Sequence, residues 1–113
     1  MKKLFVSVPK EGRHLDAIKE SVQKMKKIAE CFEGEELELL NRYAYDFPPE
    51  KCNMHIWDFA KSIEQMAQAA VFIGILEPHE WRECEAENYV ASLYGIKQYM
   101  IAPELALLED INY

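Results

Sequence analysis

Apolar positions along the chain follow two alternating patterns, one typical of strands and the other typical of helices. Short apolar runs predict four strands, at residues 3–8, 35–41, 71–76 and 97–102. Between these runs, apolar residues recur at steps of three and four, which predicts helices over residues 14–30, 56–69 and 82–94. We expect a long loop at residues 42–54, which include Pro48 and Pro49, and a short helical turn at residues 105–108.

The alternation of strands and helices predicts an α/β fold whose parallel strands are joined by right-handed crossovers. The strands are almost wholly apolar, as expected when both faces of a sheet are covered. We therefore expect a single domain over residues 1–113, a flavodoxin-like three-layer sandwich of about four strands in the order 2-1-3-4. Such folds bind ligands beyond the carboxyl ends of their strands, here between the first and third strands.

Composition and charge narrow the classes of partner. The chain has 113 residues, with 20 acidic and 13 basic side chains, and no run rich in lysine or arginine, so we expect no nucleic-acid polymer as partner. A single nucleotide is still compatible with this charge, because it needs only a local pocket. The longest apolar stretch, residues 69–76, is far shorter than the roughly 18 residues of a membrane-spanning helix. The three cysteines have neither zinc-site nor disulfide spacing, which suits the cytoplasm.

The loop after the first strand, from Pro9 to Arg13, could bind an anion. Gly12 permits an unusual backbone shape, Lys10 and Arg13 supply cationic donors, and a helix N-terminus follows. This combination can hold a phosphate or a carboxylate. The same residues also suit a plain strand-to-helix turn with exposed charges.

The segment after the third strand, residues 77–87, carries five carboxylates. Acidic residues at a helix start interact favourably with the helix dipole, so we expect no metal and no cofactor here. Glu87 is different, because steps of four place it on one helical face with Ala91 and Gly95. A carboxylate held there could be a nucleophile or a base, or it could simply border an apolar stripe.

Four further residues are candidates for ligand chemistry. His79 could donate a proton, although a lone loop histidine is more often merely exposed. Asp58 could do the same, although its place at the start of a helix explains it equally well. Tyr43, in the long loop, could stack a nucleobase, and Trp81 lies at the start of the third helix near the expected crevice.

Several segments, taken in order, resemble a known family. They are Leu4-Phe5-Val6-Ser7-Val8-Pro9, Trp57-Asp58-Phe59, Ser62 to Ile73, and Trp81-Arg82-Glu83-Cys84-Glu85-Ala86-Glu87 with Ala91 and Gly95. Their order and spacing are similar to those of the small nucleoside 2-deoxyribosyltransferase-like proteins of bacteria and phages. The similarity covers most of the chain except the long loop and the tail.

The resemblance implies cleavage of the N-glycosidic bond of a deoxyribonucleoside or its monophosphate. Glu87 occupies the position of the family's nucleophilic glutamate, and the covalent deoxyribosyl group would pass to another base or to water. Ser7, Gly12 and Arg13 match the loop that cradles the sugar or a 5′-phosphate, and Pro9 belongs to the same loop. Relatives assemble into dimers or larger oligomers, so the resemblance also implies a homo-oligomer.

The chain also departs from the family pattern. Glu83 stands where relatives carry glycine, Ala70 and Ser62 stand where they carry aspartate, and Phe5 replaces a tyrosine. These changes leave Asp58 or His79 to protonate the leaving base. An alternative is therefore a non-catalytic nucleotide-binding or protein-interaction protein that kept the fold. A flavodoxin-like FMN carrier is a third possibility, for which the sequence offers no phosphate loop.

Overall fold

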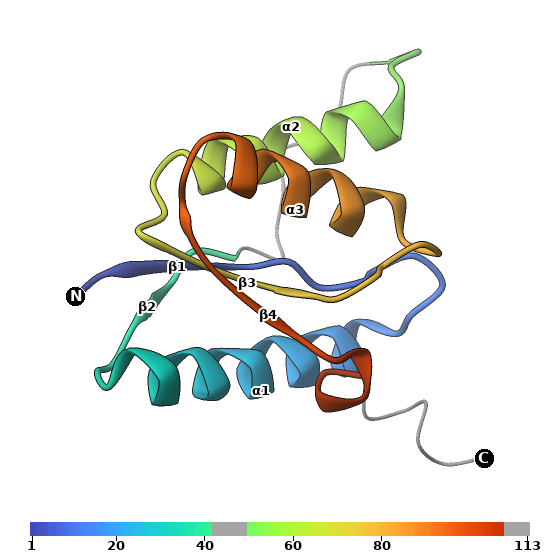
Figure 1. The fold of residues 1–113 in the computed structure, drawn as a ribbon. Coiled ribbons are helices and arrows are strands. Elements are labelled where there is room, and N and C mark those ends of the chain that lie inside the picture. The colour runs from blue at the N-terminus through green and yellow to red at the C-terminus, as the bar shows by residue number, and fades with distance from the viewer. Residues whose placement is uncertain (42–49, 108–113) are drawn as a thin grey trace.

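The computed structural model describes residues 1–41 and 50–107, in which strands and helices alternate as predicted (Figure 1). The elements are β1 (Lys3–Val6), α1 (Leu15–Glu33), β2 (Glu38–Leu39), α2 (Met54–Met66), β3 (Val71–Ile75), α3 (Arg82–Leu93), β4 (Lys97–Ile101) and the 3-10 turn η1 (Pro103–Leu105). Tyr43, a predicted ligand contact, lies outside the described residues. None of the helices in the described ranges is long and apolar enough to cross a bilayer.

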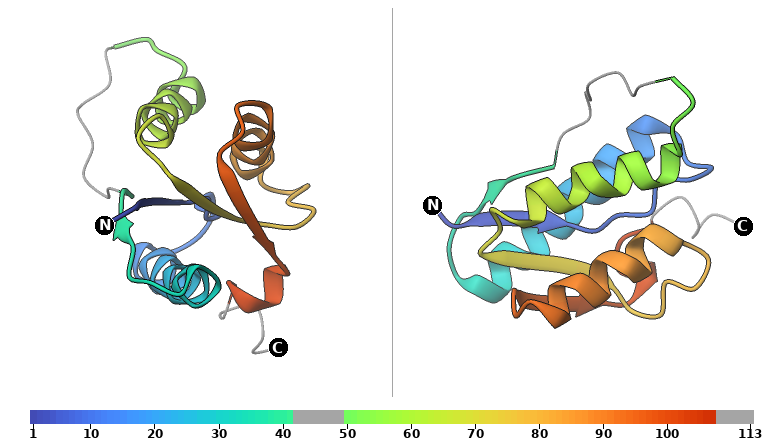
Figure 2. Two further views of the ribbon diagram at one scale, coloured as in Figure 1. Left: turned by 60° about the vertical axis from the view of Figure 1, so that its left-hand side comes forward. Right: turned by 90° about the horizontal axis from the view of Figure 1, so that it is seen from above.

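The four strands form one parallel sheet in the order β2-β1-β3-β4. The register between the central strands pairs Leu4 with Val71 and Val6 with Ile73. Helix α1 and the turn η1 cover one face, while α2 and α3 lie side by side on the other (Figures 1 and 2). The predicted α/β sandwich and its strand order are confirmed.

Two strands and one helix have other bounds than predicted, and near each of these bounds a side chain makes hydrogen bonds to the backbone. β1 ends at Val6 rather than at residue 8, and β2 is only two residues long. The amide of Asn41 then takes the place of a longer β2, because its Oδ1 accepts from the Val6 nitrogen at 2.8 Å and its Nδ2 donates to the Val6 oxygen at 2.7 Å. Helix α2 begins at Met54, two residues earlier than expected, because the Asn53 side chain caps it by accepting from the Ile56 nitrogen at 3.1 Å.

Alternate residues of β1 build two cores, one on each side of the sheet. Leu4 and Val6 belong to the cluster beneath α1, together with Ala106 and Leu107, which follow η1. Phe5 points the other way and stacks on Phe72, with ring centroids 5.9 Å apart, beneath α2 and α3. Because side chains alternate along an extended backbone, the next residue on the Phe5 side is Ser7.

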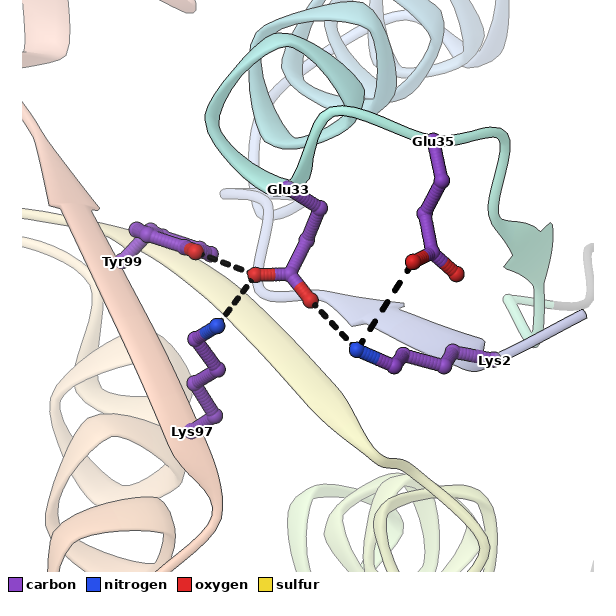
Figure 3. A network of polar contacts seen from close by, with 5 residues as sticks. All are labelled: Lys2, Glu33, Glu35, Lys97 and Tyr99. Carbon is purple, nitrogen blue, oxygen red and sulfur yellow. Dashed lines mark hydrogen bonds and ion pairs between the residues drawn. The ribbon is translucent and has the colours of Figure 1, made fainter.

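A polar network joins α1, β4 and the residue before β1 at the amino-terminal edge of the sheet (Figure 3). Glu33, in the last turn of α1, has a side chain that is only 1% exposed, and it pairs with Lys2 at 3.1 Å and with Lys97 at 2.5 Å. The Tyr99 hydroxyl also donates to Glu33. These hydrogen bonds lower the pKa of Glu33 to about 2, with the bond from Lys97 as the largest cause. They also offset the unfavourable position of a carboxylate at a helix C-terminus.

Glu33→Gln is expected to make the protein less sensitive to acid. The lowered pKa means that the carboxylate stabilises the fold above pH ~4.5, and that this stabilisation is lost as the pH falls towards 2. The variant should therefore be less stable than the wild type at pH 7, and the difference should shrink between pH 4.5 and 2. Chemical denaturation across this pH range measures it. Glu35→Gln is the matched control, because Glu35 is 45% exposed and lies 3.8 Å from Lys2; an equal effect of both substitutions would contradict the prediction.

Candidate functional site

A buried carboxyl group lies at the carboxyl edge of the sheet, where β1 and β3 end. The inner face of α3 carries Cys84, Glu87 and Ala91 at steps of three and four, and Glu87 is only 4% exposed. The Ser7 nitrogen donates to the Ile73 oxygen at 2.8 Å, which fixes Ser7 just beyond the last residue of β1. The Ser7 hydroxyl then donates to Glu87 Oε1 at 2.7 Å.

Burial changes the acid–base properties of this group. The pKa of Glu87 is raised above its usual value of 4.5, with desolvation as the largest cause. Hydrogen bonds from Ser7 and Ser62 and the charge of Lys10 oppose this shift, whereas the charge of Glu83 adds to it. Burial also raises the pKa of the neighbouring Cys84 thiol to about 12, so Cys84 is not an activated nucleophile.

A crevice opens beside this buried group, between the loop after β1 and the first turns of α2 and α3. It consists of three adjoining hollows, which share His55 and Glu83. The narrow hollow, about 30 Å³, reaches inward to Cys84. The second hollow, about 340 Å³, is lined by charged residues including Lys10, and the third hollow, about 350 Å³, includes both Phe59 and Arg82. The two larger hollows are in the size range of small-molecule sites.

Of the five predicted substrate-binding residues that the structure describes, two line the crevice, and Ser7, Gly12 and Arg13 line none of its hollows. Pro9 and Trp81 line the narrow hollow. Arg13 lines none of the three hollows and instead braces the loop, because its guanidinium donates to the Pro9 oxygen and to Ser21 Oγ, each at 2.7 Å. Gly12 is exposed, with a φ of 75° that favours glycine, and it shapes the turn without lining a hollow.

The three predicted catalytic residues do not line one common hollow. Asp58, on the second turn of α2, lines the second hollow. His79 is exposed in the loop after β3 and lines none of the three hollows. Glu87 accepts the hydrogen bond from Ser7 but lines none of the three hollows, whereas Glu83, on the same helix, lines all of them.

His55 is the crevice residue that the sequence analysis missed. It lies between the expected loop, residues 42–54, and the expected helix, residues 56–69, whereas the structure places it in the first turn of α2, whose N-terminus lies at the carboxyl edge of the sheet (Figure 1). The signal that could have found it is Asn53, a residue type favoured at helix N-caps, directly before Met54 and His55. Within the described ranges, no group of three or more histidine, cysteine, aspartate or glutamate side chains could hold a metal ion.

No protein-family model, curated protein or solved structure matches this chain. The resemblance to nucleoside 2-deoxyribosyltransferase-like proteins is therefore a prediction from the residues alone.

Proposed function

We propose that the protein cleaves the N-glycosidic bond of a deoxyribonucleoside or its monophosphate, with Glu87 as the nucleophile. The deoxyribosyl group then passes to another base or to water. The observation that supports this most is the buried Glu87 carboxyl, hydrogen-bonded to Ser7 at the ligand-binding edge of a parallel sheet. A buried carboxyl is costly for stability, so its presence beside a crevice favours a chemical role.

The surroundings of Glu87 suit attack on an anomeric carbon. The group is held by Ser7 at the end of β1 and by Ser62 on α2, so its position is set by several rigid elements. The transition state of glycosidic cleavage is oxocarbenium-like, and a desolvated carboxylate stabilises that positive charge strongly. The covalent intermediate is an ester between Glu87 and C1′ of the sugar, which a base or a water molecule then attacks.

A non-catalytic ligand-binding protein is the second candidate. One specific observation favours it: Glu83 lines all three hollows, whereas Glu87 lines none of them. On this view Glu87 would be part of the internal hydrogen-bond network. The two candidates make different predictions for substrate turnover.

Incubation with a panel of deoxynucleosides and deoxynucleotides is expected to release free base, detected by chromatography. Attack requires the ionised carboxylate, so the rate should fall as the pH drops through the raised pKa of Glu87, above the usual value of 4.5. Glu87→Gln should abolish the release. Glu85→Gln is its matched control: Glu85 is exposed on the same helix, so this substitution should leave the rate unchanged. Absence of release from every substrate, together with measurable binding of any of them, would favour the binding protein.

A further inference from the structure

His55 and Glu83 face each other across the crevice, one from α2 and the other from α3. The His55 Nδ1 atom lies 3.8 Å from Glu83 Oε1, and the two side chains are 60% and 32% exposed. Both residues line all three hollows. A ligand that fills any of the three hollows therefore meets this pair.

The proposed reaction needs a proton donor near the mouth of the site. When the bond between C1′ and the base breaks, the electron pair stays on the base, which leaves far more easily if it is protonated. Ser62, at a position where the resemblance implies aspartate, is not an acid, and His79 is outside the hollows. A histidine on the crevice is suited to this task, because histidine exchanges protons near neutral pH.

We propose that His55 is the general acid that protonates the leaving base and that Glu83 is its positioning residue. This inference rests on the proposed function. A carboxylate facing Nδ1 orients the imidazole ring and leaves Nε2 for the ligand. It also gives a role to Glu83, the residue at the position where relatives carry glycine.

The spacing of the groups along the helices fits this assignment. Glu83 precedes Glu87 by four residues, which places it about 6 Å nearer the start of α3. His55 precedes Ser62 by seven residues, which corresponds to about 10 Å along α2. Along the two helices, Glu87 and Ser62 therefore lie deeper in the molecule, and His55 and Glu83 lie at the mouth of the crevice.

The chemical steps balance with these groups alone. Glu87 forms a bond to C1′ while the bond between C1′ and the base breaks, and the base takes the proton of His55 Nε2. In the second step a water molecule attacks C1′, its proton returns to His55, and the carboxylate of Glu87 leaves. In transfer, the nitrogen of an acceptor base replaces water and gives up its own proton to His55.

The test compares two leaving groups in kcat/KM, which reports the first bond cleavage. One substrate is a deoxynucleoside that the wild type cleaves, and the other is p-nitrophenyl 2-deoxyriboside, whose phenolate leaves without a proton. We expect His55→Asn to lower kcat/KM for the nucleoside by about 10²–10⁴-fold, and for the activated substrate by less than about threefold. Glu83→Gln should show the same leaving-group dependence with a smaller loss. His14→Asn, an exposed histidine at the start of α1, is the control.

Each other outcome overturns the assignment. An equal loss on both substrates would give His55 a binding or structural role, and no loss on the nucleoside would exclude it as the acid. If the leaving-group dependence appears in Asp58→Asn or His79→Asn instead, that residue is the donor. The proposed function itself fails differently: the wild type then cleaves neither substrate, or Glu87→Gln cleaves the activated substrate as fast as the wild type.

Discussion

Glu87→Gln is expected to lower base release by roughly 10³–10⁶-fold, the range seen when a nucleophile is removed. The amide is nearly the same size as the carboxyl and can still accept the hydrogen bond from Ser7, so the fold should be retained. An amide cannot form the ester with the sugar. The loss should appear for natural and activated substrates alike, because the missing step is the attack on C1′.

The same substitution is expected to stabilise the protein at neutral and alkaline pH. The raised pKa of Glu87 means that its favourable contribution is fully present only below pH ~4.5, where the carboxyl is protonated in both states. As the pH rises through the raised pKa, the folded wild type must either ionise Glu87 in its buried site or keep it protonated, and both cost folding free energy. Gln at this position stays neutral and has no such cost. The variant should therefore gain about 1–3 kcal/mol over the wild type by pH 8, and little at pH 4.

Denaturant unfolding of both proteins at pH 4, 6 and 8 measures this gain. Glu85→Gln, an exposed carboxyl on the same helix, should show no such rise with pH. A gain that does not depend on pH, or a variant less stable than the wild type at pH 8, would contradict the buried, desolvated state of Glu87. A loss of activity joined to a gain of stability is the combination expected of a functional group rather than a structural one.

Gly74→Ala is expected to destabilise the protein by about 1–3 kcal/mol, the usual cost of overpacking a core. A Cβ atom at residue 74 would lie 2.4 Å from Asn88 Oδ1 and 2.8 Å from a ring carbon of Phe72. Phe72 is fully buried beneath α2 and α3 and cannot move freely. Asn88 could move only by giving up its hydrogen bond to the Ile75 oxygen, which is 3.0 Å long.

Thermal unfolding of Gly74→Ala checks this prediction, with a fall in Tm of about 4 °C or more for each kcal/mol lost. The double variant Gly74→Ala with Asn88→Ala removes one of the two clashing partners. Its effect should therefore be smaller than the sum of the two single effects. Strict additivity, or a cost below about 0.5 kcal/mol for Gly74→Ala, would show that α3 does not approach β3 as closely as the structure indicates.

The candidate site was partly predictable. Glu87 could be chosen because steps of four place it on the inner face of a helix with Ala91. Ser7 could be chosen only from the resemblance, since the predicted first strand, residues 3–8, included it. The direction of the Arg13 side chain was not predictable, since its partners Pro9 and Ser21 are provided by the backbone of its own loop and by α1. Nor was the place of His55, which depends on where α2 begins.

By itself, the sequence determined the order of elements, the parallel sheet and the face of α3 that turns inward. These features follow from periodic apolar positions and from the rules for connecting parallel strands, and both are local properties of the chain. Tertiary structure alone decided which polar groups meet: Ser7 with Glu87, 80 residues apart, His55 with Glu83, and Glu33 with Lys2 and Lys97. Such contacts depend on packing between elements, which adjusts by a few ångströms without changing any local pattern, so no spacing along the chain records them.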